Sequence, residues 1–293
     1  MKNQLRHETI WFWFIAPTLL LILSMELFPI LVTLSASFVD FNPILSDRPR
    51  WVGLANYLIW FDSSNQEIWF SLGRTALFAF LSVFFESLLG LILACFLRHP
   101  FPARGWIFGL LLLPVLMSPA VMGTFIRYLF DSEFGAVNWI LNHHLIWGGS
   151  SPLSFMAVLV LEVWTWTPFM MLLSLAALST VPHELNEAAK MDGAGMSFRL
   201  RRITLPLVAP LLLMGWLFRM VDAFNSFDMA MVFNGAIESQ PTTWLSLLIY
   251  GRAFEGSRSI GEPAALACLM FAVAMFFALV FLRVLNRWQA KAT

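Results

Sequence analysis

The chain has 293 residues, 59% of them hydrophobic and 12% charged, and its formal net charge at pH 7 is zero. Soluble domains carry about 25% charged residues, so lipid must cover part of this surface, and a wholly water-soluble protein is excluded. Without a basic excess there is no reason to expect nucleic acid as a partner. Cys95 and Cys268 lie in apolar runs and are expected to be small core residues, and no His or Cys spacing predicts a metal site.

Six apolar stretches follow one another along the chain, and each is long enough to cross a bilayer, which takes about 20 mostly apolar residues. Backbone polar groups in a bilayer must pair within their own segment, so helices are expected, and the stretches do not alternate as barrel strands do. The sequence predicts an all-α membrane protein with about six transmembrane helices, at residues 11–38, 75–97, 105–130, 153–178, 206–233 and 263–285.

The first stretch has features of a signal peptide, with Lys2 and Arg6 before it and Ser35-Ala36-Ser37 resembling a cleavage site. Its apolar run is nearly twice the usual length of a signal-peptide core, so we expect a retained span. Residues 1–10 then form an N-terminal segment, 11–285 the transmembrane domain and 286–293 a tail.

Lys and Arg are more frequent in the loops on the side of the N-terminus, and such loops face the cytoplasm. Both termini are therefore expected to be cytoplasmic. The cytoplasmic side holds Lys2, Arg6, Arg98, Arg104, Lys190, Arg199, Arg201, Arg202, Arg283, Arg287 and Lys291, and the opposite side holds Arg48, Arg50, Arg74, Arg252 and Arg258.

The segment 179–205 lies on the cytoplasmic side in this topology and is too polar to span the membrane. Pro182 precedes a run of good helix formers from Glu184 to Met191. Gly193 and Gly195 can adopt positive φ and turn the chain. We expect a helix–turn–helix on the membrane face.

The second helix of this segment carries Ile203 and a basic face, and we expect it to stop near Pro206. The first helix presents Glu184, Glu187 and Ala188 at i, i+3 and i+4, on one face. Small alanines permit close approach, and the carboxylates can meet basic groups of a partner. The alternative is an ordinary solvated loop.

The residues Glu187-Ala188-Ala189, Gly193, Ile203 and Leu205-Pro206 stand at the fixed positions of a known pattern. The segment resembles the "EAA" loop of the permeases of binding-protein-dependent ABC importers. The resemblance implies a coupling helix that sits in a cleft of an ATPase subunit, with Glu187 as polar anchor and Gly193 as hinge. The residues it assigns to ATPase coupling are Glu184, Glu187, Ala188, Ala189, Asp192, Gly193, Ile203, Leu205 and Pro206.

The resemblance extends along nearly the whole chain, to the maltose and glycerol-phosphate type of sugar permease. Trp51 to Tyr57 is similar to an "F-x-G-L-x-N-Y" element, which is typical of the first of two permease subunits. The chain departs from the family after the fifth span, where Phe233-Asn234-Gly235-Ala236 replaces a "T-G-G-G-P" turn. Further matching positions are Gly90 to Ala94, Leu113-Pro114 with Pro119, Phe134-Gly135 with Asn138, Phe218 to Phe224, and Phe227-Asp228.

The resemblance implies a type I ABC importer permease in a bacterial inner membrane, forming half of the pathway for a sugar or sugar-like solute (polyol, oligosaccharide or glycerol-phosphate type). Its implied partners are a second permease, an ATPase dimer that holds ATP and Mg, membrane lipid, and an extracytoplasmic solute-binding protein on the outer loops 40–74 and 234–262. The chain has no G-x-x-x-x-G-K-[ST] phosphate loop, so it is expected to bind no cofactor and to be no enzyme.

Charged residues inside the spans are functional candidates, because each costs about 2.5–3.5 kcal/mol or more to insert. Arg219 and Asp222 lie at i, i+3, and two interpretations stay open: an ion pair that locks spans together, or part of a solute pathway. Asn225, Ser226 and Asp228 continue this wettable stripe and favour a pathway. The intramembrane charges are Glu26, Glu86, Glu162, Arg219, Asp222 and Asp228.

Glu162 and Trp166 lie at i, i+4 in the fourth span and share a face. A carboxylate beside an indole can hold a sugar, although ordinary membrane packing is slightly favoured. Glu86 and Glu26 are expected to be structural. The candidate pathway residues are Glu162, Trp166, Asp222, Asn225, Ser226 and Asp228.

Two other classes of protein compete with this interpretation. A proton-coupled secondary transporter would use carboxylates such as Glu86 or Glu162, but it would usually show paired repeats with broken helices. A membrane-bound enzyme would need a catalytic cluster, and His143-His144 is the only candidate in the sequence. Neither explains the EAA loop.

Overall fold

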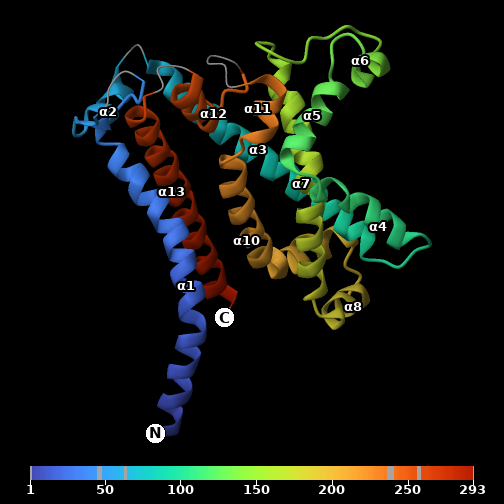
Figure 1. Cartoon of the computed structure of the whole chain (residues 1–293). Coiled ribbons are helices and arrows are strands. Elements are labelled where there is room, and N and C mark those ends of the chain that lie inside the picture. The colour runs from blue at the N-terminus through green and yellow to red at the C-terminus, as the bar shows by residue number, and fades with distance from the viewer. Residues whose placement is uncertain (1, 45–47, 63–64, 236–240, 256–258, 293) are drawn as a thin grey trace. The chain divides into compact units, whose positions relative to one another are not determined.

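The computed structural model describes residues 2–44, 48–62, 65–235, 241–255 and 259–292, with the side chains of residues 13–287 in these ranges. Arg258 and Ala236 lie outside the described residues, as do parts of both expected outer loops, and only the backbone of Lys2, Arg6 and Lys291 is described. The chain is almost entirely helical (Figure 1) and forms two compact units, Met1–Gln66 with Ile249–Phe271 and Glu67–Leu248 with Ala272–Thr293.

The first unit is built around one long helix and a small hairpin. Val39 of the hairpin pairs with Trp51 in antiparallel register. The unit contains α1 (Lys2–Ala36), β1 (Val39–Asp40), β2 (Arg50–Trp51), α2 (Ala55–Leu58), the 3₁₀ turn η1 (Ile59–Phe61), part of α12 (Leu245–Tyr250), the π turn η5 (Gly251–Glu255) and the first part of α13 (Gly261–Ala292).

The "G-L-x-N-Y" element fixes the end of α1. Gly53 has φ +60°, a conformation that glycine adopts without strain. The Asn56 side-chain amide donates to the carbonyls of Ser37 and Val39 at 2.9 Å each, and the hydroxyls of Tyr57 and Ser37 lie 2.6 Å apart. These bonds satisfy backbone groups left open where α1 ends.

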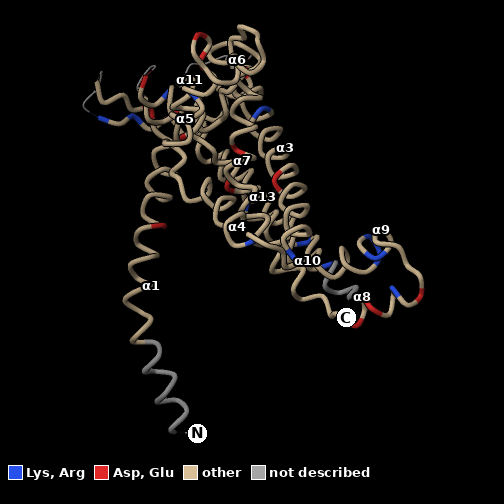
Figure 2. The backbone as a smooth tube through the Cα atoms, turned by 90° about the vertical axis from the view of Figure 1, so that its right-hand side faces the viewer, with Lys and Arg blue, Asp and Glu red and all other residues tan. Residues whose placement is uncertain are grey.

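The second unit is a helical bundle in which α7 is central. α7 packs against α4, α5, α10 and α11. In the most apolar stretch of α7, 56% of the residues are buried, compared with 33% in α3. Charged residues are sparse along these helices and gather around α8 and α9 (Figure 2). The unit contains α3 (Gln66–Leu97), α4 (Arg104–Leu112), η3 (Pro114–Leu116), α5 (Pro119–Leu129), α6 (Ala136–Leu141), α7 (Leu153–Ser179), α8 (His183–Met191), α9 (Met196–Arg199), η4 (Leu200–Thr204), α10 (Leu205–Phe224), α11 (Asp228–Asn234), the first part of α12 and the second part of α13.

Five helices in the described part of the chain are long and apolar enough to cross a membrane. Together with the bent pair discussed next they allow up to six crossings, as expected from the sequence. α7 matches the expected span 153–178 within one residue, whereas α3 begins nine residues before the expected start at 75. The added turns of α3 carry an ion pair between Arg74 and Glu67 at 2.6 Å, which suits the end of a membrane helix.

The expected third span, 105–130, is not one helix. Residues 104–116 and 119–129 form two helices bent by 100°. Pro114 and Pro119 cannot donate backbone hydrogen bonds, Met117 between them is extended, and the Ser118 side chain accepts from the Val121 amide as the cap of α5. The chain therefore restarts its helix at Ser118 rather than continuing it.

The expected stop near Pro206 is wrong, because the helix that begins at Met196 runs through Pro206 into α10. Residues 200–204 form a π-helical turn, a wider turn that accommodates a break in the regular bonding pattern. Pro206 is the second residue of α10, and the wider turn before it accommodates the hydrogen bond that a proline cannot donate. The expected span 206–233 is instead interrupted at residues 225–227, between α10 and α11.

Gly90 allows α3 and α7 to lie in close contact. A Cβ at this position would lie 2.7 Å from the backbone nitrogen of Met171 and 2.8 Å from the carbonyl carbon of Met170. Backbone atoms cannot move aside as a flexible side chain can. Gly90 therefore permits the close approach of α3 to α7, one helical turn from Glu86 of the polar cluster described next.

Candidate functional site

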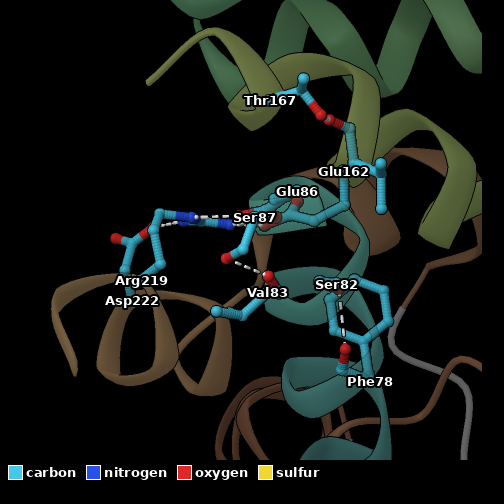
Figure 3. A network of polar contacts seen from close by, with 10 residues as sticks. Phe78, Ser82, Val83, Glu86, Ser87, Glu162, Thr167, Arg219 and Asp222 are labelled. Carbon is cyan, nitrogen blue, oxygen red and sulfur yellow. Dashed lines mark hydrogen bonds and ion pairs between the residues drawn. The ribbon is translucent and has the colours of Figure 1, made fainter. Parts of the chain in front are cut away.

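Arg219 of α10 lies at the centre of a buried ion cluster in the second unit (Figure 3). Its guanidinium donates Nε to Glu86 Oε2 and Nη2 to Glu86 Oε1, both at 2.8 Å, and Nη2 also donates to Glu162 Oε1 at 2.9 Å. Nη1 donates to Asp222 on the same helix. The Arg219 and Glu86 side chains are fully buried, and Glu162 is 4% exposed.

The cluster ties three helices together, since Glu86 belongs to α3, Glu162 to α7 and Arg219 to α10. The bidentate contact between Arg219 and Glu86 is the strong form of an ion pair, with two parallel hydrogen bonds. The expected i, i+3 pair of Arg219 and Asp222 is present, but it is one part of a larger network. Glu86 has the structural position that the sequence analysis expected, whereas Glu26 lies exposed on α1.

Trp166 covers the guanidinium on another side. The Arg219 Cζ lies 4.2 Å from the centre of the indole ring, a cation–π contact. Glu162 and Trp166 share a face of α7, as their spacing predicts, and both contact Arg219. Glu162 and Trp166 therefore pack around this arginine, and both also line the cavity described next.

A cavity of about 120 Å³ lies beside the ion cluster. Asp222, whose side chain is 44% exposed, links the two, because it binds Arg219 and also lines the cavity. All the candidate pathway residues line this one cavity: Glu162, Trp166, Asp222, Asn225, Ser226 and Asp228. Sequence reasoning missed three apolar neighbours that complete it, Pro119, Phe227 and Met229.

The break between α10 and α11 forms one wall of this cavity. The Asn225 side chain folds back to donate to the Val221 carbonyl at 2.7 Å, and the Ser226 carbonyl accepts from the Ser246 hydroxyl at 2.6 Å. Asp228 occupies the first turn of α11, where the helix dipole favours an acidic side chain. The polar residues that line the cavity thus carry carboxylate, amide and hydroxyl groups, a lining suited to a polyhydroxyl solute.

The segment 179–205 contains the expected first helix as α8. Glu184 in its first turn and Lys190 in its last complement the helix dipole. His183 Nδ1 lies 3.3 Å from Glu187 Oε1, and both side chains are largely exposed. Glu184, Glu187 and Ala188 present one exposed face of α8.

The turn after α8 is made by one glycine rather than two. Gly193 has the positive φ of +74° that the sequence analysis expected of a turn, but Gly195 has φ −64° and is extended at the start of α9. Ala189, expected beside Ala188 on the contact face, is only 9% exposed and packs inward. On a helix, neighbouring positions point about 100° apart, so Ala188 and Ala189 do not share the exposed face.

The other coupling positions have mixed exposure. Asp192 and Pro206 are exposed, whereas Ile203 and Leu205 are half-buried. The last two anchor the continuous helix from α9 into α10. The part of this segment that is open to a partner is therefore the exposed face of α8 together with Asp192.

Comparison with known proteins agrees with this architecture. A trehalose/maltose transport system permease of Thermococcus litoralis is 33% identical over 287 residues, covering 97% of this chain and 96% of the relative. A sulfoquinovosyl glycerol transport system permease of Agrobacterium fabrum is 30% identical, covering 93% and 89%. A solved bacterial ABC transporter involved in the import of alginate superposes with a TM-score of 0.81 at 18% identity, over 97% of this chain and 98% of that chain.

The family described as binding-protein-dependent transport system inner membrane component matches residues 86–291. This range contains the ion cluster, the cavity and the segment 179–205. Because it covers well over half of the chain, the chain belongs to the binding-protein-dependent transport system inner membrane components, the permease subunits of ABC importers.

Proposed function

We propose that this permease carries a sugar or sugar-like solute through the cavity bordered by Glu162, Trp166, Asp222 and Asp228. The observation that carries the proposal is the convergence of polar side chains from α7, α10 and α11 on one cavity inside a membrane bundle. Polar groups at membrane depth are costly unless they serve a pathway or pair with one another. The relatives named above are permeases for trehalose/maltose and for sulfoquinovosyl glycerol, which supports a carbohydrate solute.

In this proposal Asp222 contacts both the solute and the ion cluster. Its carboxylate binds Arg219, its side chain is still 44% exposed, and the residue lines the cavity. A sugar hydroxyl can donate to the free oxygen, while the indole of Trp166 offers an apolar surface to the sugar ring. The buried carboxylates of Glu86 and Glu162 keep the Arg219 guanidinium in place while the sugar binds.

Energy comes from a separate ATPase subunit in the proposed mechanism. The exposed face of α8, with Glu184, Glu187 and Ala188, docks into that subunit, and Gly193 provides the hinge behind it. The ATPase dimer binds ATP and Mg, a second permease completes the pathway, and a solute-binding protein delivers solute to the outer loops. Both chain termini then lie in the cytoplasm.

ATPase activity of the reconstituted assembly tests this proposal. This chain, its neighbouring permease, the ATPase and the binding protein are placed in vesicles, with trehalose and maltose as the probe solutes. Wild-type assemblies should hydrolyse ATP faster with binding protein and solute. The variant Glu187→Lys with Gly193→Asp should insert normally and lose that stimulation, because it reverses a contact charge and strains the turn.

A matched control makes the same two changes away from α8. Glu133→Lys with Gly149→Asp again reverses an exposed carboxylate and changes an exposed glycine of positive φ, on the opposite side of the proposed topology. It should keep the stimulation. If the α8 variant is stimulated as strongly as the wild type, α8 is not the coupling element.

A further inference from the structure

A second cavity, of about 410 Å³, lies behind α8 and has a different character from the solute cavity. We call it the basic cavity. Its cationic and imidazole side chains come from the end of α3, from α8 and from α9: Arg98, His99, His183, Lys190 and Arg199. No Asp or Glu is among the described residues that line it.

Arg199 lines the cavity, and one nitrogen of its guanidinium group lacks a partner among the described residues. Its Nε is buried and makes no hydrogen bond within the part of the chain that the structure describes. A buried donor without a partner costs about 1–3 kcal/mol, more when it is charged. Glu187 pairs with His183, which lines the cavity, but Glu187 does not line it. The basic cavity is thus prepared for an anion that the described chain does not itself supply.

The position of the cavity relative to the membrane limits which kind of anion can bind in it. Cys95 in the last turn of α3 and Leu178 in the last turn of α7 both line it, as does Thr204 just before α10. Cys95 and Leu178 thus lie at the ends of two helices that are long and apolar enough to cross a membrane. We therefore place the cavity at the level of the lipid headgroups. Met196, Leu178 and Leu200 add apolar lining beside the cations, as an acyl chain requires and a free inorganic ion does not.

We propose that the basic cavity binds the phosphate group of an anionic phospholipid. The proposal goes beyond the transport function and uses the cytoplasmic placement of α8 proposed above. Basic pockets between membrane helices on that side are recurrent sites for anionic headgroups. A lipid held there by Arg98 just after α3, Lys190 of α8 and Arg199 of α9 bridges the coupling segment to the membrane bundle.

Lipid retention by the purified assembly tests the proposal. The permease pair with its ATPase is extracted from bilayers of equal phosphatidylglycerol and phosphatidylcholine, without ATP or solute, and bound lipids are counted by native mass spectrometry. Wild type should retain phosphatidylglycerol in preference. Arg98→Gln with Arg199→Gln should weaken this retention about 25-fold, because each interfacial Arg contributes about a fivefold preference for an anionic lipid.

The matched control removes two cations of the same face that do not line the cavity. Arg201→Gln with Arg202→Gln lowers the charge equally, and both residues are exposed. It should leave phosphatidylglycerol retention within about threefold of wild type, since long-range attraction at a surface is screened. Equal losses in the two double variants would overturn the proposal and leave only a diffuse surface charge.

Two further outcomes separate the possible sources of the anion. If excess inorganic phosphate displaces phosphatidylglycerol from the wild type, the site is one for free phosphate and the lipid proposal fails. If the permease pair alone retains the lipid and loses it when the ATPase is added, the cavity is part of the binding site for the ATPase, and the proposal also fails. Since no ATP hydrolysis enters this measurement, its failure is separate from a failure of the coupling experiment.

Discussion

Arg219 and Arg199 belong to the same compact unit and have opposite electrostatic surroundings. Arg219 is fully buried, with Glu86, Glu162 and Asp222 around it. Arg199 lies at the membrane end of the bundle, in a cavity lined by other cations and no acid among the described residues, with its Nε buried and unbonded. In the bilayer interior a cation needs counterions from its own chain, whereas at the membrane surface lipid can provide them.

The most severe test of this contrast is Arg219→Leu. It leaves the three carboxylates without their cation, two of them almost fully buried. Removing one partner of a buried ion pair costs about 3–5 kcal/mol. We expect a loss of that size in the free energy of unfolding, measured by denaturant titration in detergent, together with low yield.

Arg74→Gln is the reference for Arg219→Leu, because the Arg74–Glu67 pair is 29% and 17% exposed. Partly exposed pairs contribute about 0–1 kcal/mol. A loss of stability in Arg219→Leu no larger than in Arg74→Gln would show that the cluster does not hold the helices.

Glu86 and Glu162 should contribute unequally to the free energy of unfolding. Glu86 accepts two hydrogen bonds from Arg219 and Glu162 accepts one. A hydrogen bond to a charged group contributes about 1.5–3 kcal/mol, and an amide replaces one acceptor by a donor that faces the guanidinium. Glu86→Gln should therefore destabilise by about 3 kcal/mol and Glu162→Gln by about 1.5 kcal/mol in the same titration. The reverse order would place the principal ion pair on α7 instead of α3.

The cluster shows where prediction from sequence ends. The pair of Arg219 and Asp222 was visible because both lie on one helix at i, i+3. The link from Arg219 to Glu86 was not, because 133 residues separate them and the sequence does not specify which helix faces meet. A charge in a span predicts that a partner exists, and only packing selects the partner.

Local breaks were harder to predict than the spans themselves. Pro114, Pro119 and Pro206 are equally visible in the sequence, yet the first two accompany a 100° bend and the third lies within a continuing helix. The difference comes from context, since Ser118 caps a new helix while a π turn precedes Pro206. Ala189 was assigned to ATPase coupling by the resemblance alone, whereas the i, i+3, i+4 pattern leaves it off the exposed face, and it packs inward.

Asp222→Asn should separate transport from stability. Because the Asp222 side chain is 44% exposed, its contribution to the free energy of unfolding should stay below about 1 kcal/mol. Loss of one charged acceptor for a sugar hydroxyl costs about 1.5 kcal/mol, so the apparent KM for trehalose uptake into vesicles should rise about tenfold. Destabilisation as large as that of Glu162→Gln, with an unchanged KM, would make Asp222 a purely structural member of the cluster.

The smallest expected effect is that of salt on the two arginine sites, Arg219 and Arg199. Raising ionic strength from about 0.1 M to about 1 M shortens the screening length from about 10 Å to about 3 Å. Retention of phosphatidylglycerol at Arg98 and Arg199 should fall several-fold. The Tm of the assembly should change by no more than about 2 °C, because the buried Arg219 cluster is screened little. A Tm that falls steeply with salt would indicate that water and ions reach Arg219.

The wide separation of the cluster along the chain has a consequence for synthesis. At about 5–20 residues per second, the 133 residues between Glu86 and Arg219 take the ribosome roughly 7–27 s. During that time α3 and later α7 enter the bilayer, each with a glutamate whose counterion has not yet been made. The nascent chain must therefore shelter two acidic side chains, at the insertion machinery or beside another subunit, until α10 arrives. The synthesis of Arg219 thus supplies the missing counterion of the cluster.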